Sequence, residues 1–242
     1  MAPGAHSSDV AICGGGLVGA TLALALAELS LDVVLIEAHP FGTFGQPSFD
    51  DRTTAISNGS RRIFEALRVW PLLEREATAI RRIHVSDRGR FGFARLDAAE
   101  QGLNALGFVC VNRAMGAALW RRLEESKVRV LAPARVRGMQ SVDGRQRIDC
   151  DLGPQGSVSV EAKLAIAADG AQSVLREAAG IGAQTWNYDQ TALVTNVLAQ
   201  RFHDHVAYER FTPSGPLALL PLSEGRLGLI WTFTAEVAQA VA

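Results

Sequence analysis

The run GGGLVG, from Gly14 to Gly19, has the composition and spacing of a phosphate-binding turn. It follows a short apolar run, Asp9–Cys13, and precedes a longer one, Ala20–Leu29. If these runs are a strand and a helix, Gly14 permits the tight turn, Gly16 lets the backbone approach a pyrophosphate, and Gly19 lets the helix pack on the strand. The helix N-terminus would add unpaired N–H groups and the positive end of its dipole. The run therefore predicts a site for a phosphate-bearing ligand.

A carboxylate stands where such a site binds ribose hydroxyls. Asp32–Glu37 is an apolar run without alternation, as buried parallel strands require, and Glu37 ends it 18 positions after Gly19. Strand, turn, helix, strand and acid in this order predict dinucleotide binding. The alternative is a glycine-rich turn with a structural role, and the pattern alone does not separate NAD from FAD.

A second candidate segment has the sequence IAADGAQSVLR. Asp169 and Gly170 end a buried apolar run there, and ligands bind at the carboxyl ends of strands in doubly wound sheets. The alternative is an ordinary turn followed by a helix that Ser173 caps.

Two arginines could contact an anionic ligand. Arg52 lies between the second strand and a helix, where it would grip a phosphate unless it pairs with Asp50 or Asp51. Arg113 opens a predicted helix, a position where the helix dipole favours acids. That conflict favours an anionic partner for Arg113, with a solvated side chain as the alternative.

Composition narrows the class of protein. The chain has 242 residues, of which 48% are hydrophobic, enough for one large domain or two small ones. Its net charge of -1 provides no strong field toward nucleic acid or acidic lipid.

The three cysteines, Cys13, Cys110 and Cys150, lack the spacing of a disulfide framework or a zinc site, which favours a reducing, cytoplasmic setting. The first residues do not have the pattern of a signal peptide, and the apolar run from Leu17 to Ala27 is shorter than the roughly 20 residues that span a bilayer.

The sequence offers no metal centre or nucleophile. His84, His203 and His205 have no carboxylate or cysteine at ligand spacing, so no metal is expected. The chain lacks a G-x-S-x-G elbow and a phosphate loop with a lysine. Chemistry would have to come from a cofactor.

The order of the elements predicts an α/β fold with a mainly parallel part and a mainly antiparallel part inserted into it. Residues 1–8 are expected to be a disordered tail, residues 39–55 a loop and residues 58–70 a helix. Residues 9–79 and 105–182 are assigned to a discontinuous, Rossmann-like cofactor domain. Residues 80–104 and 183–242 are assigned to part of a substrate domain.

The segment YERFTPSGPLALLPL, Tyr208–Leu222, holds three prolines and is therefore predicted to be a poor central strand. Its Pro213-Ser214-Gly215-Pro216 run is expected to turn the chain. Leu217–Leu222 would then form a short apolar wall or fill the core.

These segments together resemble the FAD-dependent aromatic hydroxylases of the para-hydroxybenzoate hydroxylase fold. The resemblance covers nearly the whole chain, and it is strongest to the branch that hydroxylates polyprenyl phenols in ubiquinone biosynthesis. It is carried by AICGGGLVGATLALAL, LIEA, DDRTTAISNGS, VNRAMGAALW, AADGAQSVLR and YERFTPSGPLALLPL. Within that branch, IHVSDRGRFG and LGFVCVNR are most similar to 2-polyprenyl-6-methoxyphenol hydroxylases.

The resemblance implies roles for the candidate residues. Gly14, Gly16 and Gly19 would hold the FAD pyrophosphate, and Glu37 the adenosine ribose. Arg52 and Arg113 would line the FAD groove, and Asp169 and Gly170 would serve FAD and the reducing nicotinamide. Leu217, Leu219 and Pro221 would face a polyprenyl phenol. NADPH or NADH would reduce FAD, and O2 would react to a flavin hydroperoxide that attacks the phenol ring.

The resemblance also raises an expectation about completeness. Members of the family continue well beyond this length and carry a second Gly-Asp motif, so the chain is expected to be an N-terminal portion that holds FAD weakly and has weak or no activity alone. The alternatives are an FAD oxidoreductase without oxygen chemistry, such as a polyprenyl reductase, and a non-catalytic remnant that binds a partner. Peripheral attachment to the inner membrane face or to a ubiquinone-biosynthesis complex is a further expectation. The exact phenol, the choice between NADH and NADPH and the oligomeric state do not follow from the sequence.

Overall fold

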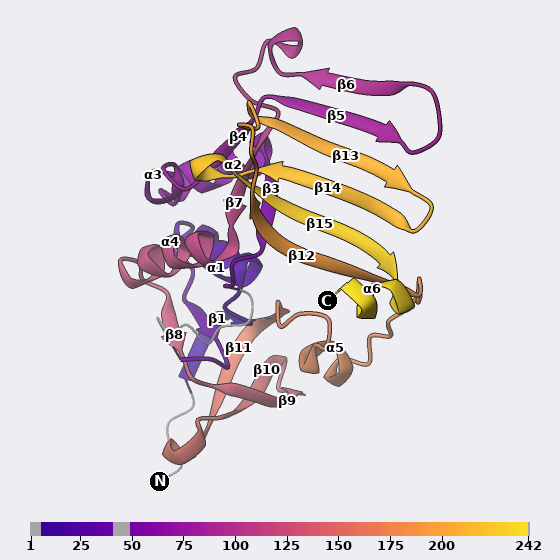
Figure 1. Cartoon of the computed structure of the whole chain (residues 1–242). Coiled ribbons are helices and arrows are strands. Elements are labelled where there is room, and N and C mark those ends of the chain that lie inside the picture. The colour runs from indigo at the N-terminus through magenta and orange to yellow at the C-terminus, as the bar shows by residue number, and fades with distance from the viewer. Residues whose placement is uncertain (1–5, 41–48, 242) are drawn as a thin grey trace. The chain divides into compact units, whose positions relative to one another are not determined.

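The structure, a computed structural model, describes residues 6–40 and 49–241. The chain forms two compact units (Figure 1). The first comprises residues 1–49, 67–69 and 115–184, and the second comprises residues 50–66, 70–114 and 185–242. The predicted α/β fold with parallel and antiparallel strands is confirmed. The assignment of segments to a cofactor domain and a substrate domain stays a prediction.

The first unit is built on a six-stranded sheet in the order β8-β2-β1-β11-β10-β9. Strands β8, β2, β1 and β11 are parallel, and β10 and β9 are antiparallel additions at one edge. The strands are β1 (His6–Cys13), β2 (Val33–Ile36), β8 (Arg129–Leu131), β9 (Arg135–Val142), β10 (Arg145–Asp151) and β11 (Ser157–Ala167). The helices are α1 (Leu17–Ala27), the greater part of α4 (Asn112–Glu124) and α5 (Val174–Ala178).

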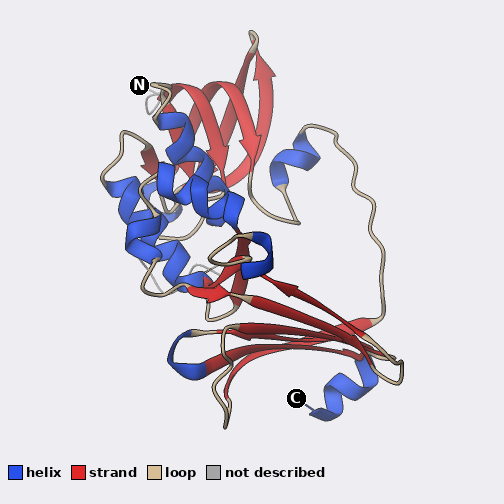
Figure 2. Cartoon of the chain, turned by 90° about the horizontal axis from the view of Figure 1, so that it is seen from above, coloured by secondary structure: helices blue, strands red, loops and turns tan. Residues whose placement is uncertain are grey.

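Burial on both faces explains why these parallel strands lack alternation. Ala11 and Cys13 of β1 belong to a core cluster on one face with Ile148 and with Leu175 of α5. Ile12 lies between them and points to the other face, where it is fully buried as well. Figure 2 shows helices along one side of this sheet.

The N-terminal tail is shorter than predicted. His6–Ser8 continue β1 and pair with Val160–Ala162 of β11, so the expectation of disorder is wrong for these three residues. Residues 1–5 lie outside the described part of the chain. The prediction failed because a polar sequence can extend a strand when a neighbouring strand offers partners for its backbone N–H and C=O groups, and β11 offers them here.

The second unit contains two sheets. The larger has the order β12-β15-β14-β13-β5-β6, with β13 and β5 as its one parallel pair, and the smaller has the order β3-β7-β4. The strands are β3 (Thr53–Ser57), β4 (Thr78–Ile80), β5 (Arg82–Asp87), β6 (Phe93–Asp97), β7 (Gly107–Val111), β12 (Gln190–Leu198), β13 (Val206–Thr212), β14 (Gly215–Pro221) and β15 (Arg226–Thr234). The helices are α2 (Asn58–Ala66), α3 (Trp70–Leu73) and α6 (Ala235–Val241).

Two sequence-based expectations are corrected in this unit. Thr53–Ser57 form strand β3 against β7, although residues up to 55 were expected to be a loop. The helix predicted over residues 58–70 is two helices, because Arg68 between them has a φ of 58°. A non-glycine residue with that φ cannot continue a right-handed helix.

The segment Tyr208–Leu222 was predicted to make a poor central strand, and that prediction is wrong. Its second half is β14, which lies between β13 and β15 (Figure 1). Within β14, Leu217–Leu219 are the residues that pair on both sides. Pro216 pairs with β13 alone and Pro221 with β15 alone. Each of these two prolines therefore lies outside the stretch that pairs on both sides, as prolines in sheets usually do.

Replacement of Ile148 by alanine is expected to destabilise the first unit by about 2–5 kcal/mol, because Ile148 is fully buried between β9 and β11. Val142→Ala is the matched control, since Val142 in the neighbouring strand is 44% exposed, and its effect should stay within about 0.5 kcal/mol. Urea unfolding of both variants measures the difference. Equal losses of stability would contradict the described core.

Candidate functional site

The glycine run forms a sharp turn between β1 and α1 in which backbone atoms approach one another closely. Gly14 has a φ of 106°, and a Cβ on it would lie 2.2 Å from the carbonyl oxygen of Ala168. A Cβ on Gly19 would lie 1.8 Å from the carbonyl oxygen of Gly14. Both added Cβ atoms would collide with backbone atoms, which cannot rotate away as the end of a side chain can. Gly14 and Gly19 therefore have the packing roles that the sequence predicts.

Two buried side chains fix the middle of the turn. The N–H of Gly15 donates to Oε2 of Glu37 at 2.6 Å, and its carbonyl accepts from the indole Nε1–H of Trp120 at 3.1 Å. Oε1 of Glu37 accepts from the N–H of His39 at 2.8 Å. Glu37 is only 4% exposed, and these two backbone donors give each of its carboxylate oxygens a hydrogen-bond partner. Sequence reasoning did not select Trp120, because nothing in a single sequence links α4 to a turn 105 positions away.

The first turn of α1 leaves its backbone donors open among the described residues. Gly16 is the N-cap, with extended backbone (φ −67°, ψ −173°) and no side-chain cap. The first N–H that bonds back within the helix is that of Ala20, to the carbonyl of Gly16. The preceding donors and the helix dipole can therefore stabilise an anion.

Asp169 organises the other side of the turn. Its carboxylate accepts from the Ser173 hydroxyl at 2.5 Å and from the N–H of Val174 at 2.9 Å, at the start of α5. Oγ of Ser173 in turn accepts from the N–H of Arg176, which confirms the predicted cap. Gly170 has a φ of 86°, a conformation that glycine adopts without strain.

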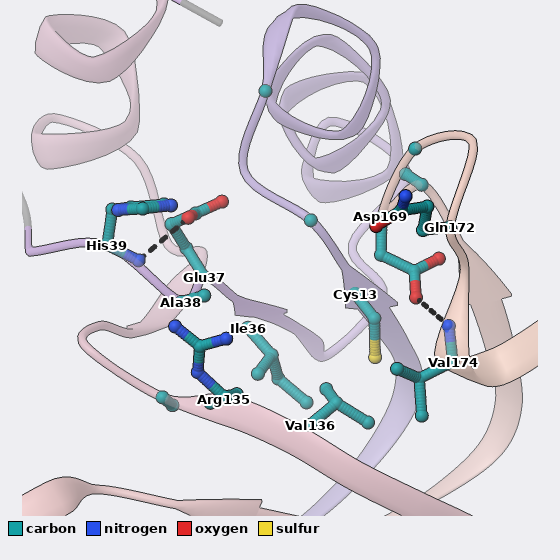
Figure 3. A pocket seen from close by; sticks show the side chains of 15 residues that line it. Cys13, Ile36, Glu37, Ala38, His39, Arg135, Val136, Asp169, Gln172 and Val174 are labelled. Atoms are coloured by element: carbon teal, nitrogen blue, oxygen red, sulfur yellow. Dashed lines mark hydrogen bonds between the residues drawn. The ribbon is translucent and has the colours of Figure 1, made fainter. Parts of the chain in front are cut away.

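One cleft of about 350 Å³ brings together five of the eight predicted cofactor-binding residues (Figure 3). Gly14, Gly16, Glu37, Asp169 and Gly170 all line it, and Gly19 lies beneath the turn. The cleft also contains residues that sequence reasoning did not select, namely Cys13, His39, Arg135 and Gln172. Arg135 is the first residue of β9, and only the fold shows that it lines the cleft.

The three cysteines are buried, and this environment disfavours their thiolate forms. Burial raises the pKa of Cys13 far above its ordinary value, and the neighbouring Cys150 and Asp169 act in the same direction. It raises the pKa values of Cys110 and Cys150 to about 12. No group of three or more His, Cys, Asp or Glu side chains with metal-binding geometry occurs in residues 6–40 and 49–241.

Arg52 and Arg113 belong to the second unit, where both pair with neighbouring acids. Nε of Arg52 lies 2.5 Å from Asp50, and Nε of Arg113 lies 3.1 Å from Asp51. Both arginine side chains are 57% exposed. For Arg52, the pairing with Asp50 is the alternative that the sequence analysis left open. A role for either arginine beside a cofactor stays a prediction.

Leu217, Leu219 and Pro221 share one face of β14 because alternate residues point the same way. Trp231 and Leu229 of β15 continue this face, opposite Leu217 and Leu219. Leu220 points to the other face, where it packs on a core cluster from β4 and β7. The face with Leu217 and Leu219 is partly exposed, and its contact with a substrate stays a prediction.

The cleft fits the adenosine and pyrophosphate parts of a dinucleotide. It combines a turn with no room for a Cβ at Gly14 or Gly19, open helix donors, and a carboxylate beside them. A family of proteins described as the FAD binding domain matches residues 7–240. The chain belongs to this FAD binding domain family.

Several curated relatives of this FAD binding domain are similar over almost all of the chain. It is 38% identical to ubiquinone hydroxylase UbiL of Rhodospirillum rubrum over 95% of the chain and 53% of that protein. It is 34% identical to 3-demethoxyubiquinol 3-hydroxylase of Escherichia coli over 93% of the chain and 57% of that protein. The chain thus spans about half the length of the curated relatives it matches.

Solved structures show the same fold. The p-nitrophenol 4-monooxygenase PnpA of Pseudomonas putida superimposes with a TM-score of 0.79 over 98% of this chain and 62% of its own, at 19% identity. At that identity the likeness concerns the fold alone.

Gly19→Ala is expected to lose FAD binding and to destabilise the first unit by about 1–3 kcal/mol, because the added Cβ overlaps the Gly14 carbonyl. Gly59→Ala is the matched control: Gly59 lies in the first turn of α2 and its added Cβ would meet nothing closer than 3.4 Å. That control should be neutral or slightly stabilising, since alanine favours helix. FAD titration by flavin fluorescence and urea unfolding measure both effects, and full FAD affinity in Gly19→Ala would refute the packing argument.

Proposed function

We propose that this chain belongs to a monooxygenase that hydroxylates a polyprenylated phenol in ubiquinone biosynthesis, using FAD, NADPH or NADH, and O2. The observation that carries the proposal is the 33–38% identity to several ubiquinone hydroxylases and monooxygenases over 93–96% of the chain. The cleft in the first unit supports it, because its residues suit the phosphate and ribose of FAD.

In this proposal the chain's residues bind and orient the cofactor. Backbone N–H groups at Gly16 and the start of α1 bind the pyrophosphate, and the Glu37 carboxylate binds the adenosine ribose while it keeps Gly15 in place. Arg135 adds a positive charge at the same cleft. The chemistry that bound FAD supplies is hydride acceptance from a nicotinamide and reduction of O2.

The remaining candidate residues complete the proposal. Arg52 and Arg113 line the FAD groove, and Asp169 and Gly170 serve the flavin and the nicotinamide. The apolar face of β14 with Leu217, Leu219 and Pro221 receives the phenol and its prenyl chain. Its task is to exclude water and to orient the ring.

The proposed location is the cytoplasm, with peripheral attachment to the inner membrane or to a ubiquinone-biosynthesis complex. Among the described residues, no helix is both long and apolar enough to cross a bilayer. A polyprenylated phenol is itself lipid-soluble, so the enzyme would meet its substrate at a membrane surface.

The protein to which this chain belongs is expected to bind FAD and, with a short-chain 2-polyprenyl-6-methoxyphenol, to couple NAD(P)H oxidation to O2 uptake. NAD(P)H oxidation is measured by the absorbance of the reduced nicotinamide, and O2 uptake is measured with an oxygen electrode. Mass analysis of the phenol shows whether it has gained an oxygen atom. Parallel runs with NADH and NADPH identify the reductant. Gly16→Val is the control, because a branched side chain at the N-cap blocks backbone approach to the pyrophosphate and should abolish FAD retention.

The outcomes separate the competing functions. Bound FAD that reduces a prenyl double bond without O2 uptake would replace the proposal by a reductase. Undetectable FAD binding would favour a non-catalytic chain, and FAD binding that survives Gly16→Val would make the glycine run a structural turn.

Leu219→Gln is expected to raise the KM for the phenol, because it places a polar amide on the apolar face of β14. FAD affinity should stay unchanged. Leu198→Gln is the control, since Leu198 is 76% exposed at the end of β12. Steady-state kinetics with both variants test the assignment, and an unchanged KM in Leu219→Gln would remove this face from the substrate site.

A further inference from the structure

The end of the large sheet in the second unit carries exposed aromatic rings among arginines. Two turns meet there, the β5–β6 turn over residues 88–92 and the β13–β14 turn over residues 213–214, and Figure 1 shows them at the same end of the sheet. The N–H of Arg88 donates to the carbonyl of Phe211 at 2.9 Å, which joins the two turns. We call this end the basic aromatic rim, formed by Arg88, Arg90, Phe91, Phe93, Arg95, Arg210 and Phe211.

The rim exposes three phenylalanines that the fold does not cover. Phe91 is fully exposed at the tip, Phe93 is 62% exposed and Phe211 is 50% exposed. By strand pairing, Phe93 shares a face with Ser86, whereas Phe211 pairs with Asp87 and points to the opposite face. Apolar rings therefore surround the end of the sheet, and such clustered exposure marks an interaction surface.

Positive charge accompanies these rings. The β5–β6 hairpin from Arg82 to Asp97 holds four arginines and two aspartates, although the whole chain has a net charge of -1. Asp87 pairs with Arg90 at 3.2 Å, yet the Arg90 side chain remains 82% exposed. The guanidinium of Arg95 lies 4.6 Å from the ring centre of Phe93, so charge and ring present one combined surface.

Protection of a sheet edge does not explain this combination. β6 is an edge strand, and Arg95 on it would hinder pairing with another chain. The exposed ring of Phe93 on the same strand would work against that protection, because it favours association. Aromatic rings with arginines are the residues that suit a lipid interface, where the rings enter the boundary with the acyl chains and the guanidinium groups contact the headgroups.

We propose that the basic aromatic rim docks this chain end-on to an anionic lipid bilayer. The rings of Phe91, Phe93 and Phe211 enter the interface, and Arg88, Arg90 and Arg210 contact the lipid phosphates. The proposal gives a surface to the membrane attachment in the proposed function and rests on that function only to this extent. Lipid binding needs neither cofactor nor substrate, so its failure and a failure of hydroxylation are separate results.

The test is sedimentation of the chain with vesicles of phosphatidylcholine alone and of phosphatidylcholine mixed with phosphatidylglycerol. Binding is expected to the anionic vesicles and to fall as salt rises. Phe91→Ser with Phe93→Ser should weaken the partition coefficient about tenfold, and Arg88→Gln with Arg90→Gln about fivefold for each arginine. The control combines Leu198→Ser and Arg75→Gln, two exposed positions away from the rim, and should bind as the unmodified chain does.

A second measurement reports the site directly. Phe91→Cys can be labelled with a nitrobenzoxadiazole dye, because the three native cysteines are buried. Its emission should shift to the blue with anionic vesicles, while the same dye at Leu198→Cys should not shift. The proposal is overturned if the chain does not sediment, if only the dye at position 198 shifts, or if the arginine variant alone weakens binding, which would indicate a simple anion-binding or acidic-protein surface.

Discussion

The contact between α1 and the end of β1 is the constraint on which the first unit depends. The helix approaches so closely that the positions of Gly19 and Gly14 leave no room for a side chain, and the Gly14 turn in turn lies against the carbonyl of Ala168 at the end of β11. Three chain segments thus meet through backbone atoms. Because α1 lies so close to β1, its open N–H groups lie at one cleft. Packing and ligand binding therefore both require glycine at positions 14 and 19.

The polar groups around this contact serve the backbone first. Glu37 accepts from the N–H groups of Gly15 and His39, and Asp169 accepts from Ser173 and Val174. Each carboxylate has two oxygens with further lone pairs, so these bonds do not prevent contact with a ligand. They do fix where each charge lies before a cofactor arrives. Such preorganisation lowers the cost of ordering the site on binding.

The sequence predicts those parts of the fold that depend on neighbouring residues. The apolar runs at β1, β2 and β11, the glycine turn and the Ser173 cap all follow from local pattern. Strands β3, β4 and β7 were missed because they are short and gain their stability from one another. β14 was misjudged because the cost of a proline depends on which ladder it interrupts, a fact set by strands that pair from outside the segment. Trp120 and Arg135 reach the cleft only through tertiary structure.

Net charge has the same limit, because it averages over positions that only the fold brings together. A value of -1 argues against attraction to acidic lipid if charges are spread evenly. Screening limits each charge to about 10 Å at 0.1 M salt, so a surface responds to its own charges and little to those on a distant side. Strand pairing brings Arg88 beside Phe211, 123 positions later, and concentrates arginines and rings at one end of a sheet. A nearly neutral chain can therefore present a basic, aromatic surface, and local composition decides what that surface binds.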